Sequence, residues 1–344
     1  MKKVRLALVG AGVIGARHLL ALQQAPEIEL VAIVDVFEET RVLAEKHEVP
    51  FFKDTQSAIT ALDIDGVIVA TPTEHHFEPA KCALTNGVHV LIEKPIMATL
   101  EEANEIVELS RSTGQRVLVG HQRRYYSLVD RTRKILRENK IGRLVAVSGQ
   151  WNMRKHDSYY DSDWRKRWQA GPVLTNLIHD MDLLRYMVGD VVSLSAELSH
   201  AVKGFEKEDA AVVTMCFDNG ALGSFVISDQ THSPWGWESA TGENLDFPQT
   251  GENVLRFMGT DGALEFPRLK LWHTANGEPE WRNKLQATNF PDELDDPYVS
   301  QLRHFAEVIQ GRSEPRIDAQ DATETLKCIL TVFQSAASGQ RVVL

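Results

Sequence analysis

A glycine-rich turn near the start of the chain constrains the fold more than any other feature. The apolar run Val4–Val9 is typical of a buried strand, Gly10-Ala11-Gly12-Val13-Ile14-Gly15 follows it directly, and a helical pattern continues to about Gln24. In such a unit the first glycine permits a tight turn, the second lets the backbone approach a pyrophosphate, and the third lets helix and strand pack closely. The N-terminus of the helix then offers N–H groups to the phosphates. The turn therefore predicts a dinucleotide-binding Rossmann domain.

An acidic residue stands where such a domain recognises its cofactor. A second predicted strand, Glu29 to Val34, ends in Asp35, twenty residues beyond Gly15. A carboxylate at this point accepts hydrogen bonds from an adenosine ribose and repels a 2′-phosphate. The next residues, Val36 and Phe37, carry no cation to offset that charge. We therefore expect the cofactor NAD, preferred over NADP.

Strand and helix patterns continue to alternate after Asp35. Further strands are predicted at Phe51-Phe52, at Gly66–Ala70, from His89 into Lys94 and at Val117–Gly120, with helices at Phe77–Asn86 and Leu100–Ser112. This order predicts a doubly wound parallel sheet. We assign residues 1–122 to an NAD-binding Rossmann domain.

The fifth of these strands ends in the stretch Val90-Leu91-Ile92-Glu93-Lys94-Pro95. Pro95 cannot donate to a strand ladder, so the strand should stop before it and leave Glu93 and Lys94 at its carboxyl end. Ligands of open α/β sheets bind outside this edge, where a lysine can serve as an acid or base. Taken alone, a lysine at a strand end is more often a solvated surface residue.

The pattern changes after Arg124. Strands are predicted at Leu144–Gln150, Val191–Leu198, Ala211–Phe217, Ala221–Ser228, Val254–Met258 and Ala263–Phe266, with helices at Tyr126–Asn139, Val299–Gln310 and Ala322–Ser338. Asp218-Asn219-Gly220 and Thr260-Asp261-Gly262 are hairpin signals. Residues 123–344 are therefore predicted to form an α+β domain on a largely antiparallel open sheet, which binds substrate and supports oligomerisation.

Composition excludes several classes of function. The formal net charge of −11 disfavours a nucleic-acid partner, because phosphate binding needs a basic face. No run reaches the roughly 18 apolar residues of a membrane span, and the short apolar run at the N-terminus lacks the features of a signal peptide. Three widely spaced cysteines without a CxxC pair fit a reducing, cytoplasmic location.

Four motifs together resemble the glucose–fructose oxidoreductase and inositol dehydrogenase family (Gfo/Idh/MocA). They are Gly10-Ala11-Gly12-Val13-Ile14-Gly15, Ala70-Thr71-Pro72, Glu93-Lys94-Pro95 and Gly120-His121-Gln122-Arg123-Arg124, and the resemblance covers essentially the whole chain. The resemblance implies NAD(P)-dependent oxidation or reduction of a sugar, cyclitol or related small polyol. It also implies that Lys94 stands between nicotinamide and substrate, and that Thr71, Pro72 and Gln122 line the cofactor.

Motifs and resemblance together define an expected cofactor site. It comprises Gly10, Gly12, Val13, Ile14, Gly15, Asp35, Thr71, Pro72, His75, Glu93, Lys94, Gln122 and Arg165. His75 and its neighbour His76 point in different directions on a helix and make a poor metal pair. A solvated or capping histidine is the commoner interpretation of both.

A basic, aromatic segment between Trp151 and Trp168 is the first candidate for substrate recognition. Trp151, Arg154 and Arg165 could stack on sugar C–H faces or donate to hydroxyl and carboxylate groups. Arg165 is favoured because members of the resembled family often carry Trp-Arg here. A solvated loop, or packing against the neighbouring domain, remains an equal alternative.

The second candidate is a predicted helix from Leu174 to about Val188. In much of the resembled family an aspartate stands four residues before the histidine that matches His179, whereas this chain has Thr175 there and Asn176 next to it. On an α-helix both can approach the face of His179. We expect Lys94 and His179 to be catalytic, with Thr175 and Asn176 as substrate contacts. Metal binding by His179, Asp180 and Asp182 is a poor alternative, because adjacent residues diverge on a helix and no third distant ligand is evident, so no metal site is expected.

These inferences lead to an NAD-linked oxidoreductase, with two rivals of other classes. The same fold occurs in non-catalytic regulators that sense a dinucleotide and in glycosidases that recycle a bound NAD. The resemblance also implies a homodimer or homotetramer formed through the C-terminal sheet. Ala211-Val212-Val213 and Phe225-Val226-Ile227 place apolar residues on both faces of that sheet, so cover by the chain's own helices is equally consistent.

Overall fold

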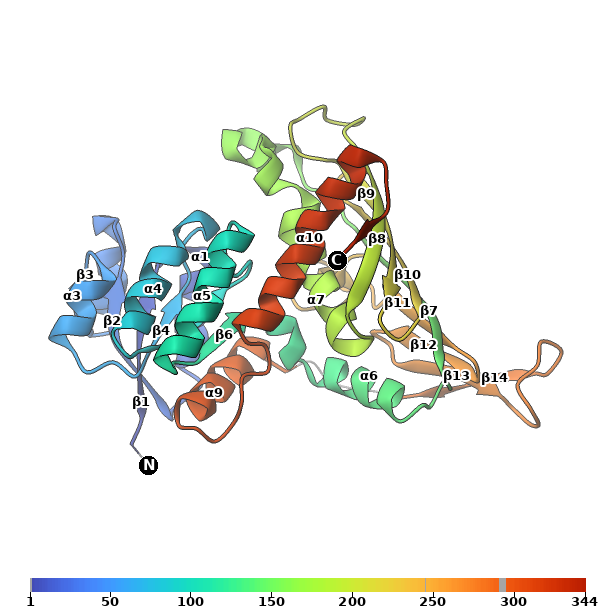
Figure 1. The fold of residues 1–344 in the computed structure, drawn as a ribbon, viewed down its shortest axis with the longest axis horizontal. Coiled ribbons are helices and arrows are strands. Elements are labelled where there is room, and N and C mark those ends of the chain that lie inside the picture. Colours follow the sequence, from blue (N-terminus) through green and yellow to red (C-terminus); the bar gives the residue numbers. More distant parts are fainter. Residues whose placement is uncertain (1, 245, 291–294) are drawn as a thin grey trace. The chain divides into compact units, whose positions relative to one another are not determined.

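The computed structural model describes residues 2–244, 246–290 and 295–344, and Figure 1 shows its ribbon. Chain contacts define two compact units, Met1–Tyr125 with Asp295–Leu326 and Tyr126–Leu294 with Lys327–Leu344. The functions assigned to residues 1–122 and 123–344, cofactor binding for the first and substrate binding with oligomerisation for the second, stay predictions.

The first unit contains the predicted parallel sheet. Its six strands have the order β3-β2-β1-β4-β5-β6, and every pairing is parallel. The strands are β1 Val4–Val9, β2 Ile28–Val34, β3 Phe51–Phe52, β4 Gly66–Val69, β5 His89–Glu93 and β6 Val117–Gly120. The helices between them are α1 Val13–Leu22, α2 Arg41–Lys46, α3 Thr55–Ala61, α4 Phe77–Thr85 and α5 Leu100–Thr113. The near-continuous burial of the central strands matches a sheet covered on both faces.

A helix from far along the chain completes this unit. Helix α9, Pro297–Ile309, begins at Asp296, whose carboxylate caps it and pairs with Arg17 of α1 at 2.7 Å. Gly66 at the start of β4 lets the helix approach, because a Cβ there would lie 2.8 Å from Ile309 Cδ1. The sequence pattern predicted this helix but placed it with the second domain, since periodicity does not reveal which sheet an amphipathic helix covers.

The second unit is built on a mixed sheet of nine strands in the order β14-β13-β12-β11-β7-β10-β9-β8-β15. Its strands are β7 Leu144–Asn152, β8 Val191–Ser199, β9 Ala210–Phe217, β10 Leu222–Ser228, β11 Leu255–Gly259, β12 Gly262–Phe266, β13 Lys270–Thr274, β14 Leu285–Asn289 and β15 Val342–Val343. The pairing of β7 with β10 is parallel and the others are antiparallel. The largely antiparallel sheet is thus confirmed. Strands β13 and β14 escaped prediction because they are short and mostly polar, and β15 because it has only two residues.

The two faces of this sheet have different surroundings. The core joins its inward side chains to those of α7, Ile178–Met187, and α10, Ala319–Ser338, among them Leu184, Ile329 and Val332. Figure 1 shows α7 and α10 on one side of β8 and β9. On the other face Val212, Leu222 and Val226 are 48%, 56% and 42% exposed. The chain's own helices therefore cover one face and leave the other uncovered.

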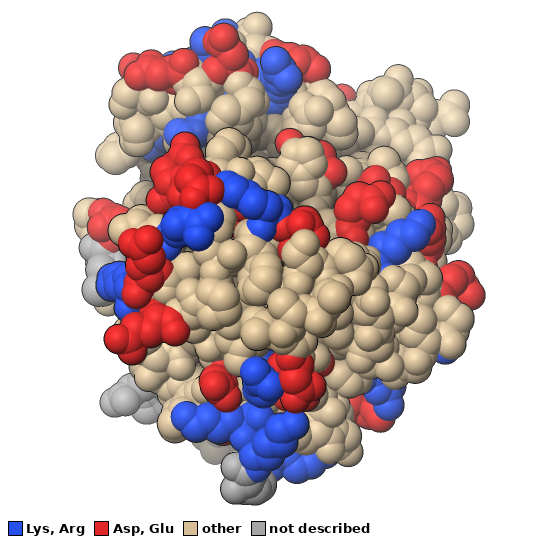
Figure 2. All heavy atoms as spheres, turned by 90° about the vertical axis from the view of Figure 1, so that its left-hand side faces the viewer, with Lys and Arg blue, Asp and Glu red and all other residues tan. Residues whose placement is uncertain are grey.

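Charged side chains do not form a basic field on the face shown in Figure 2. Lysine and arginine lie there in small groups mixed with aspartate and glutamate, around a broad area without charged residues. In the described parts of the chain, no helix has both the length and the apolar character needed to cross a membrane.

Candidate active site

The glycine-rich turn leads directly from β1 into α1. Gly12 is the N-cap residue, no side chain caps this end, and the first intrahelical hydrogen bond runs from Ala16 N to Gly12 O. The N–H groups of the first turn therefore have no acceptor within the helix. The turn presents these donors and the positive end of the helix dipole on one surface, which is suited to an anion.

The three glycines of the turn are required for different reasons. Gly10 has a φ of +90°, and a Cβ there would lie 2.7 Å from Ala70 C. A Cβ on Gly15 would lie 2.1 Å from Gly10 O. A Cβ on Gly12 would meet no protein atom within 4 Å, and its φ of −71° suits any residue. The fold itself therefore explains Gly10 and Gly15, whereas Gly12 leaves room for a ligand to approach the backbone.

Asp35 connects this turn to the end of β2. Its Oδ2 accepts a hydrogen bond from Ala11 N at 2.8 Å, and its Oδ1 accepts one from Phe37 N at 2.9 Å. Each carboxylate oxygen can accept a second hydrogen bond, so ribose hydroxyls have acceptors here. The turn and Asp35 together fit the phosphate and ribose parts of a dinucleotide.

The end of β5 contains a buried ion pair. Glu93 is 4% exposed, and its Oε1 lies 2.8 Å from His18 Nε2 of α1, which is fully buried. Burial alone would raise the pKa of the Glu93 carboxyl, but the hydrogen bond and charge of His18, with the charge of Lys94, outweigh burial and lower it. Glu93 also lies against β6, because a Cβ on Gly120 would be 2.8 Å from Glu93 Cδ. Glu93 thus anchors the strand end, and half-buried Lys94 follows it directly.

A buried histidine joins the loops after β4 and β5. His76 is 1% exposed; its Nε2 lies 2.9 Å from Thr71 O and its Nδ1 lies 3.0 Å from Pro95 O. Burial lowers the pKa of His76, although the carbonyl hydrogen bonds and Glu93 act in the opposite direction. His75 is exposed. From the sequence both histidines are expected to be solvated or capping, with His75 as the functional alternative. In the structure it is His76 that contacts both predicted ligand loops.

The segment after β6 begins with a short buried turn, Gln122–Tyr125. Gln122 is 7% exposed, and its Oε1 has no hydrogen-bond partner among the described residues. Arg124 donates to Asp321 Oδ2 at 2.6 Å, and Arg316 donates to Arg124 O at 2.6 Å. Arg124 therefore attaches the returning chain segment to the first unit, while Gln122 retains an acceptor suited to a ligand.

The basic, aromatic segment of the second unit is largely folded onto itself. Trp151 is 3% exposed, belongs to the core and donates through Nε1 to Glu238 at 2.8 Å. Arg165 stacks on the Tyr159 ring at 4.0 Å and donates to Tyr159 O at 3.0 Å. Arg154 is exposed. Of the predicted substrate residues in this segment, Arg154 and Arg165 expose side-chain surface, and Trp151 is mainly a packing residue.

His179 lies just after a π-helical turn, which corrects the predicted continuous helix from Leu174. Val173–Leu177 is π-helical and α7 starts at Ile178. Because a π turn has i→i+5 hydrogen bonding, the α-helical spacing that placed Thr175 and Asn176 on the face of His179 does not apply. The Thr175 hydroxyl donates to Gly171 O at 2.9 Å, within its own turn. His179 itself is 7% exposed.

Glu208 holds the start of this turn, a role that sequence analysis missed. It is 1% exposed, and its Oε1 accepts a hydrogen bond from Val173 N at 2.7 Å. A Cβ on Gly171 would lie 2.2 Å from Glu208 Oε2, so only glycine fits there. Burial raises the pKa of the Glu208 carboxyl, although the hydrogen bond from Val173 N opposes this. In the sequence Glu208 stands in a charged run, 207–209, which looks like a solvated surface segment. Only the structure shows that this run is buried.

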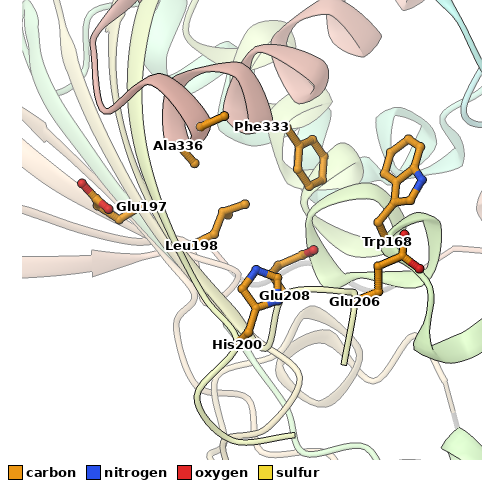
Figure 3. A pocket seen from close by; sticks show the side chains of 9 residues that line it. Trp168, Glu197, Leu198, His200, Glu206, Glu208, Phe333 and Ala336 are labelled. Atoms are coloured by element: carbon orange, nitrogen blue, oxygen red, sulfur yellow. The ribbon is translucent and has the colours of Figure 1, made fainter. Parts of the chain in front are cut away.

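A pocket of about 430 Å³ opens elsewhere in the second unit, beside β8 and α10. Figure 3 shows Phe333 of α10, Leu198 of β8, Trp168 and Glu208 around it. None of the residues predicted to be catalytic, cofactor-binding or substrate-binding lines this pocket. In the described parts of the chain, no group of three histidine, cysteine or acidic side chains is arranged to hold a metal ion.

Two models of one protein family together match nearly the whole chain. The first, for Gfo/Idh/MocA proteins, describes an oxidoreductase family with an NAD-binding Rossmann fold and matches residues 4–121. The second describes the C-terminal alpha/beta domain of that oxidoreductase family and matches residues 133–344.

Individual relatives are similar over almost their full length. The chain is 27% identical over 349 residues to a 1,5-anhydro-D-fructose reductase of Ensifer adhaerens, with 98% of this chain and 97% of the relative covered. It is 24% identical over 350 residues to the scyllo-inositol 2-dehydrogenase (NAD(+)) of Bacillus subtilis strain 168, with 99% and 96% covered. The solved structure of the WlbA dehydrogenase from Bordetella pertussis, in complex with NADH and UDP-GlcNAcA, has a TM-score of 0.80 at 23% identity, with 100% and 99% covered. That structure shows the same fold.

The glycine turn yields a paired prediction. Gly12→Ala should fold normally, with a stability change within about 0.5 kcal/mol, and should bind NAD⁺ about tenfold or more weakly. Gly15→Ala should lose about 2 kcal/mol or more of stability, because its Cβ has no space. Thermal unfolding and calorimetric titration with NAD⁺ measure the two effects. Unchanged NAD⁺ affinity in Gly12→Ala would remove this turn from the cofactor site.

His76 predicts a pH-dependent stability. Its pKa is lower in the folded chain than in the unfolded chain, so the unfolded chain binds a proton first as the pH falls. Stability contributed by neutral His76 is therefore complete above the unfolded pKa of about 6.5 and is lost below it, by up to about 1.4 kcal/mol per pH unit. His76→Asn should unfold more easily at pH 8 but lose less stability between pH 8 and 5. The exposed neighbour His75 provides the control. His75→Asn should show the wild-type dependence of the free energy of unfolding on pH, measured by chemical denaturation at each pH.

Proposed function

This chain belongs to the Gfo/Idh/MocA oxidoreductase family, and from that membership we propose that it transfers a hydride between nicotinamide and a hydroxyl or carbonyl carbon of a sugar, a cyclitol or a related polyhydroxylated molecule. The observation that carries the proposal is the position of Lys94, directly after a fully buried central strand and beside the buried Glu93–His18 pair. A proton-transferring amine is thereby attached to a rigid element at the ligand-binding edge of the sheet.

The first unit holds the cofactor in this proposal. Gly10 to Gly15 and the N-terminus of α1 bind the pyrophosphate, Asp35 accepts from the adenosine ribose, and Thr71, Pro72 and Gln122 line the remainder. When bound, the nicotinamide ring accepts or supplies the hydride. Glu93 contributes indirectly, because its buried carboxylate orients the end of β5. Roles for His75 and Arg165 at the cofactor stay predictions.

Proton transfer is assigned to Lys94. As the substrate is oxidised its hydroxyl loses a proton, and the Lys94 amine accepts it; in the reductive direction the ammonium returns it to the forming hydroxyl. The carboxylate of the preceding residue, Glu93, provides a fixed negative charge. Its Oε2 accepts a hydrogen bond from Lys94 N at 3.2 Å. The proton carrier is therefore held by its backbone as well as by its strand.

His179 and Asn176 are proposed as hydrogen-bonding groups for substrate hydroxyls. Thr175 stands four residues before His179, where the resembled family often has an aspartate, so His179 is assigned a positioning role and Lys94 the proton. Asn176 is favoured over Thr175 as a substrate contact, because the single proton of the Thr175 hydroxyl already has two acceptors, Gly171 O and Asn176 Oδ1, each at 2.9 Å. The Asn176 side chain has amide N–H donors in addition to that oxygen. Arg154 and Arg165 offer further donors to a polyhydroxylated or acidic substrate.

The substrate class rests on the relatives. They include proteins named as a 1,5-anhydro-D-fructose reductase, a scyllo-inositol 2-dehydrogenase and a D-apiose dehydrogenase. A panel of sugars, anhydro sugars, inositols and sugar acids, screened with NAD⁺ and NADP⁺ and with their reduced forms by absorbance of the reduced cofactor, tests the proposal. Cofactor-dependent turnover of one class supports it. Release of sugar from a glycoside without net NADH would instead indicate a cofactor-recycling glycosidase.

The uncovered face of the C-terminal sheet is proposed as the surface that binds a second copy of the chain, in a homodimer or homotetramer. Val212 and Val226 lie opposite each other on neighbouring strands, and Leu222 extends the same face. Exposed aliphatic side chains in register on a sheet favour a protein partner over solvent. A cytoplasmic location stays a prediction.

Substitution of Lys94 tests the mechanism. Lys94→Ala should lower kcat by about 10²–10⁴ on the best substrate of the panel, because the proton carrier is lost. NAD⁺ affinity should change far less, since phosphate and ribose contacts lie elsewhere. Lys81→Ala is a matched control, because Lys81 is an exposed lysine of α4 that pairs with Glu105. Near-normal turnover in Lys94→Ala would assign the proton to another residue.

Cofactor preference gives a separate prediction. Calorimetry should show tighter binding of NAD⁺ than of NADP⁺, because the Asp35 carboxylate accepts from a 2′-hydroxyl and repels a 2′-phosphate. Asp35→Ser should narrow the difference by weakening NAD⁺ and relieving the repulsion. Equal or tighter binding of NADP⁺ by the wild-type chain would contradict the assignment of Asp35.

A further inference from the structure

Two cations converge on one carboxylate immediately beyond Asp35. Glu38 opens the short helix Glu38–Thr40 after β2. Its Oε1 accepts a hydrogen bond from the Arg41 Nε, and its Oε2 lies 2.7 Å from Lys53 Nζ. Arg41 and Lys53 also lie over the Phe51 ring, at 4.6 and 5.0 Å from its centroid. The cluster is thus defined by hydrogen bonds and by a shared aromatic platform.

This cluster lies at the edge of the sheet where Asp35 is found. Lys53 Nζ donates to Val36 O at 3.2 Å, one residue beyond Asp35. Asp35 N in turn donates to Phe52 O at 3.0 Å, so the residue before Lys53 is fixed beside Asp35. The two residues that follow Asp35 in the sequence, Val36 and Phe37, carry no cation. The structure brings two cations to this turn from α2 and from the end of β3.

We propose that Glu38 is a specificity residue that excludes NADP by keeping Arg41 and Lys53 engaged at the adenosine end of the cofactor site. The inference rests on the proposed NAD-linked function and deepens it. A 2′-phosphate carries close to two negative charges and three strong acceptor oxygens, and proteins that bind it supply arginine or lysine donors. Here the available donors already serve Glu38, and the carboxylates of Glu38 and Asp35 both repel the phosphate.

The charges near this turn show how Glu38 would act on the choice between NAD and NADP. Asp35, Glu38 and Glu39 oppose Arg41 and Lys53, so the turn carries one net negative charge. Hydrogen bonds from Arg41, and then from Lys53, lower the pKa of Glu38 to about 2. Glu38 is therefore ionised at neutral pH, where the cofactor titrations are made.

A neighbouring glutamate provides a matched control. Glu39 is exposed on the same short helix, and among the described residues no ion pair or hydrogen bond from its side chain is found. Glu38→Gln and Glu39→Gln change the net charge equally, but only the first releases Arg41 and Lys53. Any difference between the two variants therefore excludes a general loss of negative charge. It leaves two causes at Glu38, the release of the cations and the loss of its own repulsion of the phosphate, which the variants that also lack a cation separate.

Calorimetric titration with NAD⁺ and NADP⁺ tests the proposal on the wild-type chain, Glu38→Gln, Glu39→Gln and Glu38→Gln/Arg41→Ala. The ratio of NADP⁺ to NAD⁺ affinity should rise about tenfold in Glu38→Gln and less than about twofold in Glu39→Gln. NAD⁺ affinity itself should stay constant in both. The double variant should lose most of the gain, and added salt should reduce the gain because the charges are exposed.

The outcomes separate this inference from the proposed function. If the wild-type chain binds neither dinucleotide, the proposed function fails. If NAD⁺ binds normally and the affinity ratio is the same in Glu38→Gln and Glu39→Gln, the specificity role of Glu38 is wrong. A gain that persists in the Arg41 double variant but disappears in Glu38→Gln/Lys53→Ala identifies Lys53 as the released donor. A gain that persists in both double variants is caused by the lost charge of Glu38 alone and overturns the proposal.

Discussion

A buried carboxylate–imidazole pair holds together the first unit's candidate site. Glu93 at the end of β5 meets His18 of α1 at 2.8 Å, and both side chains are essentially inaccessible to solvent. The pair connects the helix that follows the glycine turn to the strand that ends in Lys94. Leaving either partner alone would bury an uncompensated polar group, which costs several kcal/mol. The relative position of the glycine turn and Lys94 therefore depends on this contact.

A buried network of charged side chains likewise fixes part of the second unit. Glu208 accepts the first N–H of the π-helical turn, and Lys207 beside it is fully buried against Asp229 at 2.9 Å. Tyr160 donates to the same aspartate at 3.0 Å, so the segment before the turn is held as well. Buried ionic networks of this kind are weak evidence for stability, and they define one geometry when every member is satisfied. In this chain that geometry fixes the start of the π-helical turn, and with it the positions of Asn176 and His179.

The proposed preference for NAD over NADP rests on the charged side chains near the end of β2. Asp35 is committed to two backbone donors and still has acceptor capacity. Glu38 adds a second carboxylate and engages the nearby cations, so two separate features of this turn support the proposed preference for a hydroxyl over a phosphate. The exposed position of Glu38 makes each contribution modest and dependent on salt.

Local sequence patterns determined the parts of this protein that depend on neighbours along the chain. The glycine spacing, the buried strands, Asp35 and Lys94 at strand ends, and most strands of the antiparallel sheet were all predicted from runs and periodicities. Tertiary structure decided the rest: the bridging position of His76, the capping by Glu208, the cations gathered by Glu38, the π turn before His179 and the unit to which α9 belongs. Apart from the Glu38–Arg41 pair, whose members are three residues apart, these features depend on contacts between residues distant in sequence. A period of two or 3.6 residues carries no information about which distant side chain fills the space beside it.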